Sequence, residues 1–232
     1  MISTEGIVLR ATQYTSSAYI LKVYTRHEGI VSVMLRTSKK NNRQALKEQL
    51  SIVEISYASG RGEVVHPKEI QLSIPYKTIS HDFDKRAIAI FLGEILSKSI
   101  VDASDDEDLY DFIRAALITL DDSEVYLDFH VWFLWKFARF LGIGPYLNPD
   151  KHPFFDFQEA VSLPYAPIHP NYIEGDLYRA LCEVNQAKFH HDIKLSNDLR
   201  KQLLNLSCDY YLTHLHGLRE IKSLEVIQSL YL

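Results

Sequence analysis

The sequence predicts an α+β protein in which a small N-terminal β-barrel of five strands is followed by an α-helical domain. Up to residue 74, short β-branched or aromatic runs alternate with turn-like residues, which is the pattern of strands. After Pro75, apolar residues recur three and four positions apart, which is the pattern of helices. We therefore expect two domains, a barrel over residues 1–77 and helices over 78–232.

The five expected strands are 4–11, 17–25, 29–36, 51–59 and a stretch around 64–74. Side chains alternate between the two faces of a strand. Leu21 and Val23 then face the core in the second strand, as do Val33 and Leu35 in the third. The same alternation collects four side chains on the non-core face: Arg10, Lys22, Tyr24 and Arg36.

Helical spacing returns in several segments of the second domain. The first helix covers about 81–101 with Asp82 as its N-cap, and the second follows Ser104, which can cap it. An aromatic segment at 126–142 holds both tryptophans and is expected as the central helix of a bundle. Further helices are expected near 176–186, from Ser196 to about 216, and at 223–232.

A proline-rich insert interrupts the helices at about 143–175, with six of the eight prolines. A small hairpin is expected in it, around 154–163. No apolar run approaches the roughly 20 residues that a membrane helix needs. The N-terminal segment has no secretory pattern, so a cytoplasmic protein is expected.

Charge is distributed unevenly along the chain, whose formal net charge is -5. Residues 1–77 hold 11 Lys/Arg and 6 Asp/Glu, whereas residues 78–232 hold 14 and 24. A basic first third joined to an acidic remainder suggests two modules with different partners.

The basic charge is densest in the segment 36–47, RTSKKNNRQALK, which has five cations and no acid before Glu48. We expect a loop between the third and fourth strands. Tyr19 and Tyr24 lie on the second strand and Tyr14 precedes it, where bases can stack. Together with the cationic sheet face, this favours nucleic-acid binding over a merely solvated loop. The candidate residues are Arg10, Lys22, Tyr24, Arg26, Arg36, Lys39, Lys40, Arg43 and Lys47.

Two other classes of function stay open. A metal-dependent nuclease would use the acids at 105–108, but four consecutive acids at a helix start cannot converge on one ion and suit the helix dipole instead. A protein-interaction adaptor would carry the basic loop incidentally. The two cysteines, Cys182 and Cys208, form no CxxC pair, and no catalytic motif is present. We expect no enzyme activity, no cofactor and no metal.

Three segments resemble the RecO family of bacterial recombination mediators: 4–36 with its TEGIVLR start and YTRHEG turn, RFLGIGP at 139–145, and HLHGLREIKSLEVI at 214–227. The resemblance implies an OB-fold followed by a helical domain, in a nucleoid-associated protein without enzymatic activity. It implies binding of single- and double-stranded DNA, and annealing of complementary strands. It also implies work with RecR, and often RecF, to load RecA onto DNA coated by single-strand binding protein (SSB).

One part of the chain departs from the family pattern. Many members carry a four-cysteine zinc module, whereas residues 147–170 contain no cysteine, so we expect no zinc. The resemblance also implies a site for the acidic C-terminal tail of SSB, which needs an apolar pocket rimmed by cations. The candidates are Lys136, Arg139, Arg219 and Lys222. For Lys136 and Arg139 the alternative is ordinary snorkelling from a buried helix.

Overall fold

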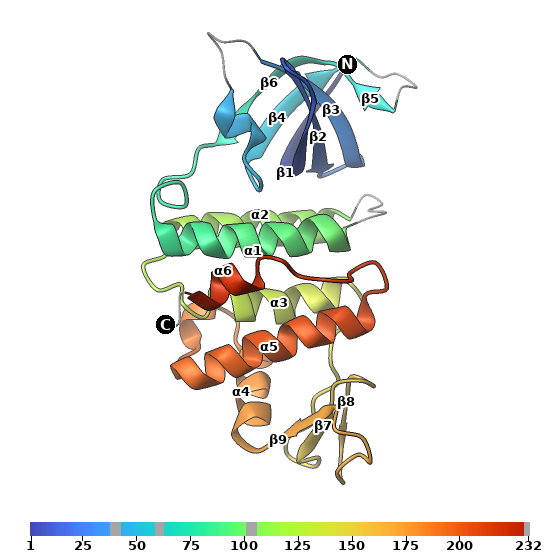
Figure 1. Cartoon of the computed structure of the whole chain (residues 1–232), viewed down its shortest axis with the longest axis vertical. Coiled ribbons are helices and arrows are strands. Elements are labelled where there is room, and N and C mark those ends of the chain that lie inside the picture. Colours follow the sequence, from blue (N-terminus) through green and yellow to red (C-terminus); the bar gives the residue numbers. More distant parts are fainter. Residues whose placement is uncertain (38–42, 59–62, 101–105, 230–232) are drawn as a thin grey trace. The chain divides into compact units, whose positions relative to one another are not determined.

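The computed structural model describes residues 1–37, 43–58, 63–100 and 106–229 (Figure 1). The chain divides into two compact units, Met1–Asp122 and Ser123–Leu232. Helices α1 (Phe83–Ser99) and α2 (Glu107–Asp122) thus belong to the same unit as the sheet. A domain boundary at residue 77 stays a prediction.

The first unit contains a curled six-stranded sheet that forms a half-barrel, which agrees with the expected OB-fold and α+β class (Figure 1). The strands have the order β5-β3-β2-β1-β4-β6, and all neighbours are antiparallel except β3 and β5. Their bounds are β1 Ile2–Thr15, β2 Ala18–Thr25, β3 Gly29–Arg36, β4 Ile52–Tyr57, β5 Val64–Val65 and β6 Pro67–Ile74. The expected fifth strand is therefore two strands, because β5 pairs with β3 whereas β6 pairs with β4.

The barrel core confirms the alternation predicted for β2 and β3. Leu21, Val23, Val33 and Leu35 are all fully buried in one hydrophobic cluster. Each such side chain contributes about 1.5–3 kcal/mol to folding when it is removed from water. In β1 the alternation is broken by a register shift between Val8 and Arg10, so Val8 joins the core cluster while Arg10 is exposed.

The helices of the first unit begin at aspartate caps. The Asp82 carboxylate accepts hydrogen bonds from the backbone N–H groups of Asp84 and Lys85, which confirms the predicted cap of α1. At α2, Asp106 accepts from the N–H of Leu109 at 2.9 Å. The predicted cap Ser104 lies outside the described residues, so its role stays a prediction.

A hydrogen-bond cluster around Glu5 fixes α2 to the sheet. The Glu5 carboxylate of β1 accepts from Arg114 Nε at 2.5 Å, from the Tyr110 hydroxyl at 3.1 Å and from Ser73 Oγ at 2.5 Å. Burial alone raises the pKa of Glu5, but these donors outweigh it and leave the pKa below its usual value. The carboxylate thus stays charged and ties α2 to β1 and β6.

A second aspartate holds the connection between the sheet and α1. The buried Asp121 carboxylate, at the end of α2, accepts from the backbone N–H groups of Lys77, Thr78 and Ile79 at 2.7, 2.8 and 2.9 Å. The buried Lys85 ammonium donates to the backbone carbonyl of Asp121 at 2.8 Å. The connection from β6 to α1 is therefore attached to the end of α2.

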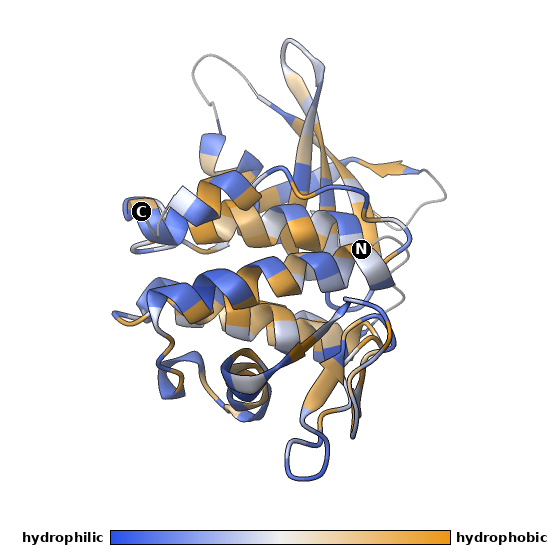
Figure 2. Ribbon diagram, turned by 60° about the horizontal axis from the view of Figure 1, so that its bottom comes forward, coloured by the Kyte–Doolittle hydropathy of each residue, from blue (hydrophilic) through white to orange (hydrophobic). Residues whose placement is uncertain are grey.

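The second unit is a helical bundle around α3 (Phe129–Phe140), which contacts α4 (Gly175–Gln186) and α5 (Asn197–His214). Every residue of α3 is buried except Lys136, Arg139 and Phe140, so the predicted central helix is confirmed. Ser196 caps α5 as predicted, accepting from the N–H of Leu199. The last helix, α6, covers Leu224–Gln228. Figure 2 shows that several helices carry both hydrophilic and hydrophobic residues.

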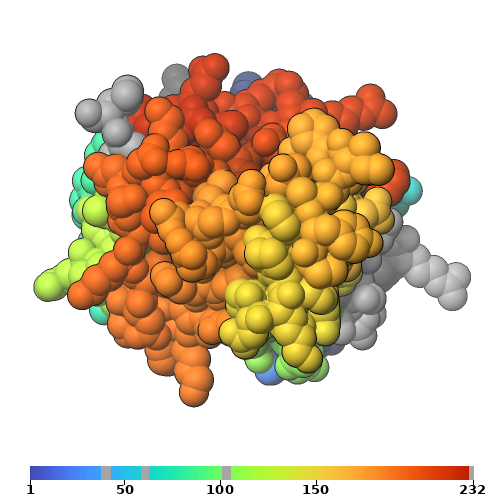
Figure 3. Space-filling view, turned by 90° about the horizontal axis from the view of Figure 1, so that it is seen from below, coloured from blue at the N-terminus to red at the C-terminus, as the bar shows by residue number. Residues whose placement is uncertain are grey.

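The proline-rich insert contains a small sheet of the order β8-β7-β9. The predicted hairpin is confirmed as β7 (Phe154–Asp156) paired with β8 (Val161–Leu163), and β9 (Tyr172–Glu174) lies on the other side of β7. The insert packs beside α4 on the surface of this unit (Figure 3). Among the described residues, no helix is long and apolar enough to cross a membrane.

Candidate nucleic-acid interface

The strand register brings three of the predicted cations onto one face of the sheet. Arg10 of β1 lies opposite Lys22 of β2, and Lys22 lies opposite Ser32 of β3. Two pleats beyond Ser32, Arg36 points to the same side, away from the hydrophobic core. Arg10, Lys22 and Arg36 are all exposed, so this part of the face is open to solvent.

Tyr24 lies on the same face of β2, but the expectation that it is exposed is wrong. Its ring is fully buried with its centroid 5.8 Å from that of Tyr110 in α2, and its hydroxyl donates to the carbonyl of Asp106 at 3.0 Å. Burial, together with the Asp106 carboxylate, raises the pKa of Tyr24 to about 12. Because α2 covers this end of the face, the Tyr24 ring has no free surface on which a base can stack.

Arg26, in the turn between β2 and β3, is also held by α2. Its Nε and Nη2 donate to the two carboxylate oxygens of Asp111 at 3.0 and 2.8 Å, and Nη2 lies 3.2 Å from Glu107 Oε2. His27 Nδ1 lies 3.2 Å from Glu107 Oε1. The Arg26 side chain is still 39% exposed, but two carboxylates already compensate its charge.

The basic segment 36–47 is described at its two ends. Arg36 and Arg43 are exposed, and the short 3-10 helix Gln44–Lys47 buries Leu46 in the barrel core. The Lys47 ammonium lies 4.3 Å from the ring centroid of Tyr19, a cation–π contact. Lys39 and Lys40 lie outside the described residues, so their part in the interface stays a prediction.

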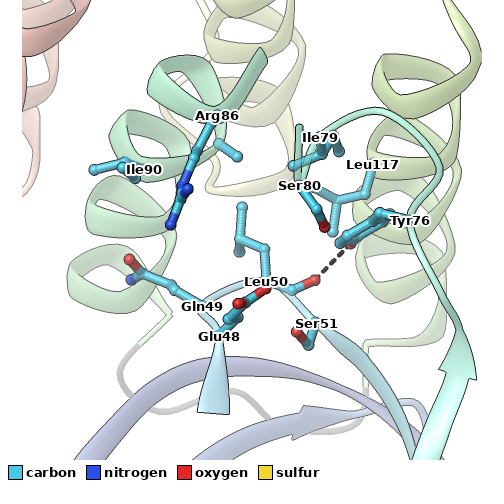
Figure 4. A pocket seen from close by; sticks show the side chains of 11 residues that line it. Glu48, Gln49, Leu50, Ser51, Tyr76, Ile79, Ser80, Arg86, Ile90 and Leu117 are labelled. Carbon is cyan, nitrogen blue, oxygen red and sulfur yellow. Dashed lines mark hydrogen bonds between the residues drawn. The ribbon is translucent and has the colours of Figure 1, made fainter. Parts of the chain in front are cut away.

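A pocket of about 160 Å³ lies in the first unit between residues 48–51, the connection 76–80 and the helices α1 and α2 (Figure 4). The Tyr76 hydroxyl donates to the carbonyl of Leu50 at 2.5 Å, and burial raises the pKa of Tyr76. Arg86 from α1 and Glu48 give the pocket charges of opposite sign. Ser51 and Ser80 line the pocket, but no histidine does. The residues that line the pocket therefore include no histidine base for a serine nucleophile.

The described acids at the start of α2 do not converge on one point. Asp106 caps the helix, whereas Glu107 pairs with Arg26 and His27. Within the described ranges, no group of three or more His, Cys, Asp or Glu side chains is placed to hold a metal ion. The structure therefore offers the nuclease alternative no metal cluster in the part of the chain that it describes.

The four residues of the second predicted site make different contacts. Lys136 Nζ and Arg139 Nη2 of α3 both donate to the carbonyl of Asn185, at 2.8 and 3.0 Å, where α4 ends. Burial lowers the pKa of Lys136, and so does the neighbouring Arg139 charge. These two cations are thus held together at the C-terminus of α4, as helix dipoles favour. Arg219 is exposed, and Lys222 pairs with Glu220 at 3.1 Å.

Comparison with known proteins agrees with the sequence resemblance. The family model described as "Recombination protein O N terminal" matches residues 1–66, and "Recombination protein O C terminal" matches residues 80–225. Curated relatives described as "DNA repair protein RecO" include those of Flavobacterium psychrophilum (30% identical, 99% of both chains covered), Bacteroides fragilis (28%, 98% of both) and Porphyromonas gingivalis (27%, 100% of this chain and 99% of the relative). The matches cover the N-terminal sheet and the helical region alike. The chain therefore belongs to the RecO family of DNA repair proteins.

Proposed function

We propose that this protein is a recombination mediator that binds single- and double-stranded DNA, anneals complementary strands, and works with RecR to load RecA onto DNA coated by SSB. Membership of the RecO family supports a role in DNA repair and recombination. The observation that carries the DNA-binding part is the open sheet face with Arg10, Lys22 and Arg36. RecF is a further proposed partner, and the proposed location is the cytoplasm, at the nucleoid.

DNA binding at this face would be electrostatic and independent of sequence. Arginine and lysine side chains neutralise phosphates without reading bases, which suits a protein that must act on any damaged DNA. If roughly 4 to 6 phosphates are neutralised by the face and the basic segment, log affinity should fall with log salt at a slope of about -3 to -5.

The test is fluorescence anisotropy of the triple variant Lys39→Glu, Lys40→Glu, Arg43→Glu across a salt series. We expect weaker binding of single- and double-stranded DNA alike, a flatter salt slope and slower annealing. Folding should be nearly unchanged, because Arg43 is exposed and substitutions at exposed positions cost little. An affinity and slope equal to those of the unsubstituted protein would mean that the basic segment is only a solvated surface.

Annealing and nuclease activity separate the mediator from its alternatives. Complementary labelled oligonucleotides are mixed with the protein, with and without magnesium. A mediator anneals them intact, a nuclease degrades them when magnesium is added, and an adaptor shows no salt-sensitive binding. The engagement of Asp106, Glu107 and Asp111 in a helix cap and ion pairs favours the mediator over the nuclease.

We also propose that the second unit binds the acidic tail of SSB. The Lys136/Arg139 pair is the better supported half of the predicted site, because both side chains have donors to spare beyond the one each gives to Asn185. Changing this pair to Glu should weaken binding of the tail peptide, measured by calorimetric titration, and leave binding of naked DNA unchanged. The pair Arg219→Glu, Lys222→Glu is the matched second variant.

If both double variants bound the peptide with unchanged affinity, the tail would bind at another site. Because Lys136 and Arg139 hold the end of α4, a circular dichroism melt must accompany the first variant. The absence of stoichiometric zinc remains part of the proposal. Elemental analysis that finds one zinc per chain would contradict it.

A further inference from the structure

An open hollow of about 340 Å³ lies beside the turn that joins β1 and β2. The residues that shape it include Tyr14, Ser17, Met34, Arg36 and His66. They come from the end of β1, the turn after it, β3, and the residue between β5 and β6. The volume lies at the lower end of the range for small-ligand sites. The hollow shares Arg36 with the cationic sheet face.

Tyr14 is suited to bind a flat ring in this hollow. The residue is 66% exposed, near the end of β1. By contrast, Tyr24 is fully buried under α2, and Tyr19 is half-buried with the Lys47 ammonium over its ring. Of the three tyrosines close to the basic segment in sequence, Tyr14 is therefore the one with a free aromatic face.

The neighbours of Tyr14 suit a nucleotide rather than a purely apolar ligand. The Arg36 guanidinium is exposed and can bind a phosphate next to a stacked base. Met34 supplies a polarisable apolar contact, and Ser17 and His66 supply polar groups that can meet a base edge. Arg10 and Lys22 continue the same face, so a strand that leaves the hollow meets further cations.

We propose that this hollow is a subsite for one unpaired base of single-stranded DNA, with the base stacked on Tyr14 and the adjoining phosphate bound by Arg36. The subsite rests on the proposed DNA-binding function and adds strand preference to it. Bases of an intact duplex are stacked on one another and cannot reach the ring, whereas unpaired bases can. Tyr14 then distinguishes the two forms of DNA, and Arg36 serves both.

The test measures the affinity of a single-stranded oligonucleotide and of its duplex by anisotropy. Tyr14→Ala should lower the affinity for the single strand by about 5- to 100-fold, which is the usual range for one stacked base. The affinity for the duplex should not change. The salt slope should be retained, because no charge is removed. Arg36→Gln should weaken both forms and reduce the magnitude of the slope by about 1.

Two variants serve as controls. Tyr14→Phe keeps the ring and should bind as the unsubstituted protein does. Tyr146→Ala removes a tyrosine of matching exposure, 65%, in the second unit and should change neither affinity. An oligonucleotide with 2-aminopurine gives a second readout. Its fluorescence should be quenched by the unsubstituted protein and by Tyr14→Phe, and less by Tyr14→Ala.

The outcomes separate the subsite from the proposed function. Salt-sensitive DNA binding with equal single-strand affinity for Tyr14→Ala and the unsubstituted protein would overturn the subsite and leave the function standing. If Tyr14→Ala lost affinity for the single strand and the duplex equally, the subsite would also be overturned, because the effect would not come from base stacking. No DNA binding by the unsubstituted protein would overturn the proposed function itself.

Discussion

The face formed by β1, β2 and β3 has two halves that look alike in sequence and differ in the folded protein. One half carries Arg10, Lys22 and Arg36 and is open to solvent. The other carries Tyr24 and ends at Arg26, and α2 covers it with Tyr110, Glu107 and Asp111. Arginine occurs in both halves, so the presence of a cation does not separate them. What separates them is a helix that begins some 80 residues later in the chain.

The comparison teaches that cations of one β-hairpin can have different functions. A guanidinium that already makes a bidentate pair with a carboxylate gains less from a phosphate, because it must first lose its partner. Arg26 is in that position, whereas Arg36 makes no such ion pair among the described contacts. We therefore assign phosphate binding to the open half and attachment of α2 to the covered half.

The largest effect is expected from reversing charge in the open half. The double variant Lys22→Glu, Arg36→Glu loses two phosphate contacts and adds repulsion, so DNA affinity near 0.1 M salt should fall by about 100-fold. The free energy of unfolding should change by less than about 1 kcal/mol, because both positions are exposed. Anisotropy and a urea titration test the two statements. A fall of less than about threefold would contradict the assignment.

The next effect concerns the attachment of α2. Glu5→Gln removes the charge that accepts from Arg114, Tyr110 and Ser73, and should lower the free energy of unfolding by about 1–3 kcal/mol. Hydrogen exchange in β1 and α2 should accelerate, while exchange in α3 and α5 serves as the internal reference. Equal protection of α2 in both proteins would mean that other contacts attach the helix.

At acid pH, the difference in the free energy of unfolding between Glu5→Gln and the unsubstituted protein should become smaller. The pKa of Glu5 is lowered from 4.5 in the folded state, so its contribution to stability is present above about that pH and is lost as the pH falls through the lowered value. Below it, both proteins carry a neutral side chain at position 5. Urea titrations at pH 7 and at pH 3 should show a stability gap that narrows. A constant gap would mean that charge at Glu5 is unimportant.

The smallest effect is expected from Arg26→Gln. Since Asp111 and Glu107 already compensate this charge, DNA affinity should change by no more than about threefold, against about tenfold for Arg36→Gln at the same salt concentration. The two variants remove the same group from the same β2–β3 hairpin, one in its turn and one at the end of β3, so each is the control for the other. Equal losses would show that the covered half also binds DNA.

Rules that depend on the local sequence predicted much of the fold. Alternation identified Leu21, Val23, Val33 and Leu35 as core residues, and capping chemistry identified Asp82 and Ser196. These rules hold because they depend on neighbours within a few positions in the chain. The hairpin in the proline-rich insert was found in the same way.

What the sequence did not reveal depends on distant contacts. Alternation places Tyr24 on the correct face but contains no information on α2, whose Asp111 lies 85 positions from its partner Arg26. The register shift in β1 buries Val8, and pairing with β3 separates β5 from β6. For Tyr14 the sequence suggested stacking, but only the exposure of its ring distinguishes it from Tyr19 and Tyr24.

Asp121 has a consequence for how the first unit opens. By accepting from the amides of Lys77, Thr78 and Ile79, it closes a loop of the chain without a covalent bond, across 44 positions from Lys77. The entropic cost of closing such a loop grows only slowly with its length, so a loop of this length costs little more to close than a shorter one. The two ends of this loop meet at the contacts between residues 77–79 and Asp121. The two helices inside it should therefore detach together, as one cooperative unit, when these contacts are broken.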